Sequence, residues 1–379
     1  MKPRRIAVVM TALSAALAVA ACGSSNNTTT TTTPSGGSSG SSGSSSAVAP
    51  GTINGAGSTL AAPIYQQWGS TLKGQGLTVN YNPVGSGAGI TQLQSAIVNF
   101  AGSDPSLKPA DQEKAKGTML QFPTAFGAIT MSYNLKSAGI KSGVSLTGPV
   151  IADIFLGKVT KWNSPEITSL PGNAALKLPG TTITVVHRSD SSGTTAGFTT
   201  FLADTSPEWK SSVGSGKDVK WPTGTGAAKN SGVAATISQT DGALGYVEQA
   251  YALQNGFTYA SVENSSMKFV LPSIEATSAA ADGITVPPDL GISTINSSNP
   301  AAYPIVSQTF LVAYEDACKA GISQSTAKAV KSFLTYALGD GQKTLGAGSN
   351  QLPYAPLPSS LQSTVQGQLS KLVCNGSAL

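Results

Sequence analysis

The chain has 379 residues, of which 40% are hydrophobic and 11% are charged, and it contains 42 glycines. This composition is typical of a loop-rich globular protein and excludes a coiled coil or a wholly disordered chain, and the length predicts two domains or lobes. The net charge is +5, and removing Lys2, Arg4 and Arg5 with the leader described next leaves +2, which is too little for a nucleic-acid-binding surface.

The N-terminus has the three parts of a secretory signal peptide, which we assign to residues 1–21. Basic residues come first, followed by an apolar run over residues 6–21 and small residues directly before Cys22. A small-residue cleavage site that ends at a cysteine resembles the lipobox of bacterial lipoproteins, which implies that Cys22 is lipid-modified, with palmitate, and becomes the first residue. The alternative is a plain cleavable signal with an accidental cysteine. No other run of about 18 apolar residues follows.

Residues 22–49 are predicted to form a tether. Beyond Cys22 they are almost only Ser, Thr, Gly and Asn, including six threonines at 28–33, so they cannot bury a core. A flexible chain of about 25 residues has ends roughly 25–30 Å apart. We expect the tether to hold a folded domain near a membrane, and O-glycosylation of its threonines is left open.

From Pro50 onward, short apolar runs alternate with helical patterns, which predicts α/β layers. Three segments are predicted to place a turn rich in Gly, Ser or Thr before a helix: a glycine-rich turn at 51–57, a strand at 77–81 with a turn at 85–89, and a strand at 183–186 with a turn at 189–194. The apolar positions expected on one face of the three helices are Leu60, Ile64, Trp68 and Leu72, then Ile90, Leu93 and Ile97, then Phe198, Phe201 and Leu202.

Near the C-terminus, apolar spacing around residues 330–334 and 361–372 predicts two amphipathic helices that close the last lobe.

Two cysteines remain after the leader, Cys318 and Cys374, and in an exported chain we expect them to form a disulfide. Two separate buried thiols are the alternative. His187 is the single histidine, so a zinc site is disfavoured, and no metal or cofactor is expected.

A strand-to-helix turn built from Gly and Ser/Thr exposes backbone N–H groups at the positive end of a helix, where an oxyanion can approach closely. One such turn is weak evidence, since most glycine turns are simply tight connections. The spacing at 85–89 is not the GxGxxG pattern, and GxxxxGK[ST] does not occur, so a nucleotide site is disfavoured.

Read with their neighbours, the turns resemble a known family. Residues 55–68, GAGSTLAAPIYQQW, resemble the opening motif GAGxTxPAPxYxxW of the PstS family, the phosphate-binding proteins of high-affinity phosphate ABC importers. The loops at 81–89, 100–104 and 187–194 resemble the family's later motifs in the same order. The segments 121–124, 154–162 and 242–248 are also similar, so the resemblance covers residues 50–379.

The resemblance implies a two-lobe α/β fold of the periplasmic-binding-protein type (type II-like), whose lobes are joined by two hinge strands. These strands are expected near 128–135 and 304–314. Lobe one would then combine residues 50–133 with 304–379, and lobe two would contain residues 134–303. Phosphate would lie between the lobes and favour their closure.

The resemblance also implies a set of phosphate-binding residues. Arg188 would supply a cation and Asp190 would orient it. Leu60 stands where many members have Phe, and His187 stands where a second Arg is frequent. Neighbouring side chains on a strand point to opposite faces, so His187 should face away from Arg188. We therefore expect His187 to be structural. The implied phosphate-binding residues are Thr59, Leu60 through its backbone amide, Ser86, Asp104, Arg188, Ser192, Gly193 and Thr194.

Asp104 is the most informative of these positions. A carboxylate in an anion site is unfavourable unless the ligand brings its own proton, because like charges repel and an acceptor is left without a donor. Hydrogen phosphate carries such a proton and fully ionised sulfate does not. Asp104 is therefore expected to reject sulfate, by roughly 10⁴- to 10⁵-fold.

The sequence thus predicts a bacterial lipoprotein on the extracytoplasmic face of the cell membrane. It is expected to bind phosphate, to contact the membrane permease subunits of an ABC importer, and to be a monomer. An enzyme is disfavoured because a nucleophilic Ser192 needs a positioned base, and His187 lies five residues earlier on the preceding strand. Two alternatives stay open: a binding protein for another oxyanion such as sulfate or molybdate, and a surface adhesin or antigen that retains the fold.

Overall fold

The computed structural model describes residues 48–379. The expected signal peptide (1–21), the lipidated Cys22 and nearly all of the tether lie outside the described residues. Within residues 48–379, none of the helices combines the length and the hydrophobicity that a membrane crossing needs.

A nine-stranded mixed sheet runs through the described part of the chain, in the order β2-β1-β3-β12-β4-β8-β6-β7, with β9 beside β4. Two small sheets, β11-β10-β5 and β13-β14, accompany it. The strands are β1 (Gly51–Gly57), β2 (Leu77–Asn82), β3 (Phe100–Ser103), β4 (Met119–Tyr133), β5 (Ser145–Leu146), β6 (Thr184–Arg188), β7 (Thr225–Ala227), β8 (Ala243–Glu248), β9 (Thr258–Tyr259), β10 (Ser261–Glu263), β11 (Phe269–Val270), β12 (Val306–Tyr314), β13 (Val373–Cys374) and β14 (Ser377–Ala378).

Helices cover this sheet and connect its parallel strands. They are α1 (Ala62–Lys73), α2 (Ser86–Gln94), α3 (Pro109–Glu113), α4 (Gly148–Phe155), α5 (Pro165–Thr168), α6 (Gly193–Thr205), α7 (Pro207–Ser212), α8 (Lys229–Gln239), α9 (Gln249–Gln254), α10 (Ile274–Ala279), α11 (Gln324–Leu338) and α12 (Ser359–Gln368), with short 3₁₀ turns η1 (Lys136–Ala138), η2 (Asn173–Leu176), η3 (Asp340–Thr344) and η4 (Leu369–Lys371).

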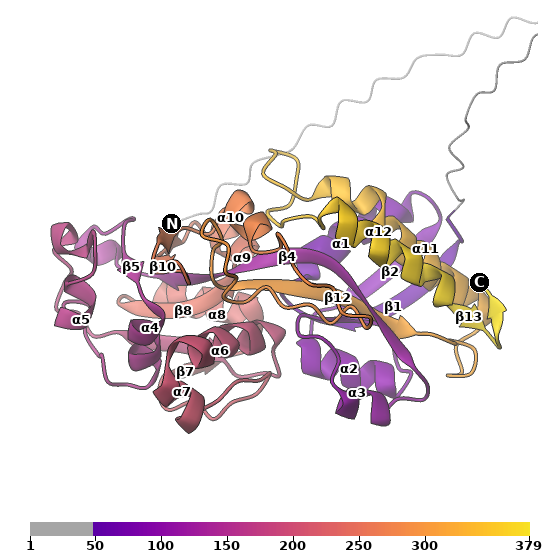
Figure 1. The fold of residues 1–379 in the computed structure, drawn as a ribbon, viewed down its shortest axis with the longest axis horizontal. Coiled ribbons are helices and arrows are strands. Elements are labelled where there is room, and N and C mark those ends of the chain that lie inside the picture. The colour runs from indigo at the N-terminus through magenta and orange to yellow at the C-terminus, as the bar shows by residue number, and fades with distance from the viewer. Residues whose placement is uncertain (1–47) are drawn as a thin grey trace, which may run out of the picture. The chain divides into compact units, whose positions relative to one another are not determined.

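Two long strands, β4 and β12, link the two halves of the sheet. The first part of β4, residues 119–128, pairs antiparallel with β12, and its last part, residues 129–133, pairs antiparallel with β8. In Figure 1, β4 and β12 run through the middle, with α1, α2, α11 and α12 on one side and α4 to α8 on the other. The two-lobe α/β fold is therefore confirmed, while the lobe boundaries at residues 133/134 and 303/304 stay a prediction.

Parallel pairing fixes where the loops of the site lie. Strand β1 is parallel to both β2 and β3, and β6 is parallel to both β7 and β8. In open α/β sheets, ligands bind at the carboxyl ends of such strands. The loops that follow β1, β2, β3 and β6, together with the first turns of the helices after them, contain all of the predicted phosphate-binding residues except Arg188, which ends β6.

The expected glycine-rich turn at residues 51–57 is wrong, because this segment is strand β1. Its glycines allow close packing against β3 rather than a reversal of the chain. A Cβ added at Gly55 would lie 2.1 Å from the Phe100 ring, and one added at Gly57 would lie 2.1 Å from the carbonyl oxygen of Gly102. The turn before α1 is instead formed by residues 58–61.

The apolar face predicted for the second helix is too long at its C-terminal end, because it includes Ile97. Helix α2 ends at Gln94, and Ala96 adopts a left-handed conformation with φ of 55°, which stops the helix. Ile97 lies beyond this point and is 70% exposed. The other predicted positions, from Leu60 to Leu202, are buried. Of the C-terminal pair, α11 buries Val330, Phe333 and Leu334, and α12 ends at Gln368 before η4.

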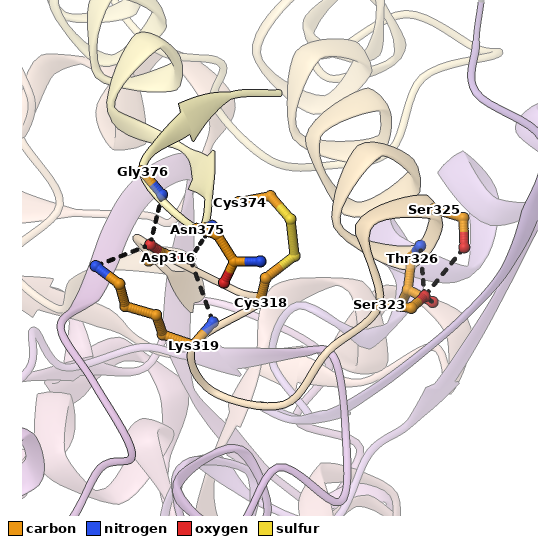
Figure 2. Close-up of a disulfide and its surroundings, with 9 residues drawn as sticks. All are labelled: Asp316, Cys318, Lys319, Ser323, Ser325, Thr326, Cys374, Asn375 and Gly376. Carbon is orange, nitrogen blue, oxygen red and sulfur yellow. Dashed lines mark hydrogen bonds and ion pairs between the residues drawn. A yellow bond between two sulfur atoms is a disulfide. The ribbon is translucent and has the colours of Figure 1, made fainter.

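A disulfide joins Cys318 to Cys374, 56 residues apart (Figure 2). Beside it, the Asp316 carboxylate accepts hydrogen bonds from the backbone N–H groups of Asn375 at 2.8 Å and Gly376 at 3.0 Å. The disulfide and this carboxylate together hold the β13–β14 hairpin to the turn that follows β12.

Replacing both Cys318 and Cys374 with Ser should lower the free energy of unfolding by about 2–4 kcal/mol, because the unfolded chain is released from a long closed loop. Urea denaturation of the oxidised native chain and the double variant measures this difference. The reduced native chain is the control and should match the variant. Equal unfolding midpoints for all three samples would contradict the expectation.

Candidate anion-binding site

The N-terminus of α6 forms one wall of the site. Strand β6 ends at Arg188, and Ser192 caps the helix by accepting the backbone N–H of Thr195 at 3.1 Å through its Oγ. Because Ser192 Oγ accepts this bond, its own proton is available to another acceptor. The N–H groups of Gly193 and Thr194, in the first helical turn, have no partner four residues earlier and lie at the positive end of the helix.

Arg188 is 2% exposed and is held by a two-pronged ion pair with Asp190. Its Nε donates to Asp190 Oδ1 at 2.7 Å and its Nη2 to Oδ2 at 2.5 Å, while Nη1 donates to Thr194 Oγ1 at 3.4 Å. Partial burial acts to raise the pKa of Asp190, but the hydrogen bonds and charge of Arg188 outweigh it and lower that pKa below its usual value. The predicted Arg188–Asp190 pairing is present, and it orients the guanidinium toward Thr194.

Asp104 follows β3 and is 1% exposed. Its Oδ1 accepts hydrogen bonds from Ser58 Oγ at 2.5 Å and Thr309 Oγ1 at 3.0 Å, and its Oδ2 contacts Ser86 Oγ at 3.4 Å. Burial raises the pKa of Asp104 to about 6, although these three hydroxyls and the charge of Arg188 act to lower it. The carboxyl group is thus mostly ionised at neutral pH, with Oδ1 engaged by two donors and Oδ2 more lightly held.

Glycines bring the two sides of the site into contact. A Cβ added at Gly193 would lie 2.2 Å from Asp104 Oδ2 and 2.5 Å from Ser86 Oγ, so the α6 N-terminus lies directly against these side chains. The backbone N–H of Gly87, in the first turn of α2, donates to the carbonyl of Ser191 at 3.2 Å. No larger residue fits at position 193 without moving a neighbour.

The loop after β1 is held from two directions. The hydroxyl of Tyr251, on α9, donates to the carbonyl of Thr59 at 2.8 Å, and that of Tyr354 donates to the carbonyl of Leu60 at 2.8 Å. The side chain of Asn230, on α8, donates to Thr59 Oγ1 at 2.9 Å and to Thr194 Oγ1 at 3.2 Å. Through these contacts the structure brings all eight predicted residues into one cluster, although their contact with a ligand stays a prediction.

His187 lies outside this cluster. Its ring stacks on Trp221 with a centroid distance of 4.6 Å, and its Nδ1 is 3.0 Å from the Arg188 carbonyl oxygen. These contacts pack the far side of β6 rather than the anion-binding side.

Comparison with known proteins identifies the family. The family model of the PBP superfamily domain matches residues 24–340. The phosphate-binding protein PstS of Pasteurella multocida (strain Pm70) is 40% identical over 321 residues, which cover 84% of this chain and 89% of that protein. The chain belongs to the PBP superfamily, within its PstS family. The phosphate-binding protein PstS of Xylella fastidiosa (strain 9a5c) is 39% identical, over 83% of this chain and 84% of that protein.

The PstS-family assignment agrees with the fold. The crystal structure of a phosphate-binding protein from Stenotrophomonas maltophilia superposes with a TM-score of 0.61 at 23% identity, covering 84% of this chain and 94% of that one. The resemblance first noted in the sequence motifs is therefore confirmed at the level of family and fold.

This PstS-family chain also buries a second carboxyl group, Glu248, which the motif at 242–248 contains without indicating its role. Glu248 is fully buried, and its Oε2 accepts the backbone N–H of Ala250 at 2.8 Å and lies 2.8 Å from the Tyr354 hydroxyl. Its Oε1 has no hydrogen-bond partner among residues 48–379. The Tyr354 hydroxyl has one proton and already faces the Leu60 carbonyl, so both contacts are satisfied together only when Glu248 is protonated.

Burial raises the pKa of Glu248 from 4.5 to about 8, although the N–H of Ala250 acts to lower it. Between these values the folded chain holds a proton on Glu248 that the unfolded chain has lost, so the contribution of Glu248 to the free energy of unfolding is greatest at low pH and falls as the pH rises. The expected loss is about 1.4 kcal/mol per pH unit between about pH 5 and 7.5. Glu248→Gln stays uncharged and should lack this contribution.

Urea unfolding of the native chain and Glu248→Gln at pH 5, 6 and 7, both free of bound anion, measures the effect. The native free energy of unfolding minus that of the variant should fall by about 1.4 kcal/mol per pH unit. Both proteins contain Asp104, so the difference between them removes the effect of its titration. A difference that does not change with pH would show that Glu248 is ionised in the folded chain.

Proposed function

We propose that this chain captures inorganic phosphate outside the cytoplasm and delivers it to an ABC importer. The observation that carries the proposal is the meeting of a buried Arg188, the positive N-terminus of α6 and a buried carboxylate, Asp104, in one cluster of hydroxyl groups. Cation and N–H groups attract an oxyanion, while the carboxylate requires that the oxyanion carry a proton. The relatives named PstS are phosphate-binding proteins and are similar over most of the chain.

The proposed contacts divide by chemistry. Arg188 and the N–H groups of Leu60, Gly193 and Thr194 donate to phosphate oxygens, as do the hydroxyls of Thr59, Ser86, Ser192 and Thr194. Asp104 Oδ2 accepts the proton of hydrogen phosphate, because Oδ1 is engaged by Ser58 and Thr309. Sulfate has no proton to offer, so it leaves Oδ2 facing another acceptor.

The ligand is proposed to lie between two lobes, residues 50–133 with 304–379, and residues 134–303. Contacts across this division, from Gly87 to Ser191 and from Asn230 to Thr59, support a closed arrangement of the lobes. Phosphate that bridges both lobes would favour this closed form, which the importer would recognise. Small-angle X-ray scattering should show a smaller radius of gyration with phosphate, and identical profiles would contradict ligand-driven closure.

We further propose that the mature chain begins at a lipid-modified Cys22, is anchored to the outer face of the bacterial cell membrane, and acts as a monomer. The support is the pattern of residues 1–22 and the polar tether that follows. Cys22→Ser should shift the protein from the membrane fraction to the medium. Unchanged fractionation would contradict the anchor.

Delivery is tested in cells that lack this chain. We expect them to take up radiolabelled phosphate more slowly at low micromolar concentration, and the native gene to restore uptake. Normal uptake in cells shown to have no second phosphate-binding protein would contradict a role in import.

A further inference from the structure

Asn230 is a fully buried amide side chain at the start of α8 that connects two of the predicted phosphate-binding threonines. Its Nδ2 lies 2.9 Å from Thr59 Oγ1 and 3.2 Å from Thr194 Oγ1. Thr59 follows β1 and Thr194 belongs to α6, so the two hydroxyls come from opposite sides of the site. Neither the motifs nor the apolar spacing of the sequence single out Asn230.

The orientation of the Asn230 amide follows from its third contact. The backbone N–H of Glu248 donates to Asn230 Oδ1 at 3.0 Å. A donor at this position requires the amide oxygen there, so the NH₂ group must face the two threonines. The amide has two N–H protons, and two hydroxyl oxygens lie within reach of them.

This arrangement determines what the threonine hydroxyls can do. An oxygen that accepts an N–H bond uses one of its two lone pairs, and its own proton then points away from that donor and is available to another acceptor. Thr194 Oγ1 also faces Arg188 Nη1 at 3.4 Å, so both of its lone pairs have donors. Thr59 Oγ1 accepts from Asn230 alone among the described residues, so Asn230 occupies one of its two lone pairs and keeps its proton from pointing toward α8.

We propose that Asn230 is a positioning residue that makes the hydroxyl groups of Thr59 and Thr194 hydrogen-bond donors to the bound anion. The inference rests on the proposed phosphate site, and it adds a residue that does not touch phosphate. An isolated hydroxyl can present either a proton or a lone pair to an oxyanion, and the second is repulsive. By occupying one lone pair of each hydroxyl, Asn230 favours the orientation in which the hydroxyl proton faces the anion.

A double-mutant cycle between Asn230→Ala and Thr59→Val tests this inference by calorimetric titration with inorganic phosphate. In the native background, Thr59→Val should weaken binding roughly 10- to 100-fold, because a hydrogen bond to a charged ligand is lost. In the Asn230→Ala background, the same change should cost only about 2- to 3-fold, since the Thr59 hydroxyl is no longer oriented. Equal effects in both backgrounds would overturn the inference.

Asn230→Asp adds a readout that a purely structural role would not change. Its carboxylate accepts hydrogen bonds from both threonines, so the chain should still fold while the hydroxyl protons turn away from the ligand. Phosphate affinity should fall by at least about 100-fold at pH 8 and recover partly toward pH 5, relative to the native chain at each pH, as the new carboxyl group gains a proton. A loss that is constant over this range would count against the orientation effect.

Asn264→Ala is the matched control. Asn264 is 5% exposed, donates to the carbonyls of Pro300 and Ala302, and accepts the backbone N–H of Ser266. The Asn264→Ala variant therefore loses bonds that a buried amide donates and accepts, as Asn230→Ala does, but none of them reaches the predicted site. Its phosphate affinity should equal that of the native chain. If the native chain itself fails to bind phosphate, the proposed function is wrong; if it binds and the cycle is additive, only the role of Asn230 is wrong.

Discussion

Arg188→Met should weaken phosphate binding by about 1,000-fold, equivalent to about 4 kcal/mol. The substitution removes a buried guanidinium and leaves the Asp190 carboxylate, 19% exposed in its side chain, without its partner. Phosphate then meets two carboxylates, Asp104 and Asp190, with no adjacent guanidinium to offset them. Calorimetric titration of the folded, anion-free variant measures the loss, and circular dichroism checks the fold.

The double variant Arg188→Met/Asp190→Asn separates loss of the cation from the appearance of an unpaired carboxylate. It removes the ion pair as a whole, so net charge matches the native chain. Phosphate binding should remain at least about 100-fold weaker than native, because the donors of Arg188 are still absent. Recovery of native affinity in the double variant would show that Arg188 serves only to neutralise Asp190.

Asp104→Asn should let sulfate bind. Ser58 and Thr309 both donate to Oδ1, so they should select the amide oxygen and direct the new NH₂ group to the position of Oδ2, beside Gly193. A donor then replaces the acceptor that hydrogen phosphate needs. Selectivity for phosphate over sulfate should fall from roughly 10⁴–10⁵ to below about 100-fold, with phosphate itself weakened by about 10- to 100-fold.

Asp190→Asn is the charge-matched control for this experiment. It also removes one carboxylate from the cluster, but Asp190 faces Arg188 and the N–H of Lys229 rather than the proposed ligand. Sulfate should still be rejected by this variant. Sulfate binding in both variants would mean that net negative charge, not the proton-accepting geometry of Asp104, sets the selectivity.

The sequence predicts the arrangement of the site correctly where the residues involved are close together in the chain. The capped N-terminus of α6 and the Arg188–Asp190 pair lie within eight residues, so their pattern predicts their arrangement. It was misleading at residues 51–57, where glycines indicate a turn but in fact allow β1 to pack closely on the Phe100 ring. Local composition cannot distinguish these two uses of glycine, because the difference depends on a strand some 45 residues away.

Residues that act through long-range contacts were not predictable from the sequence. Asn230 reaches Thr59 across 171 positions, Tyr354 reaches Glu248 across 106, and Thr309 reaches Asp104 across 205. Each is a buried polar group whose partner is set by tertiary packing alone, and none interrupts a periodic pattern. The signal that identifies them is burial with defined hydrogen-bond partners, which only the structure supplies.

The most direct test of phosphate capture is calorimetric titration of the native chain, stripped of bound anion, with phosphate and then with sulfate. We expect phosphate to bind with a dissociation constant at or below about 1 μM, near −8 kcal/mol or stronger, and sulfate to give no heat of binding. Absence of phosphate binding by a folded chain that is verified to be ligand-free would contradict phosphate capture.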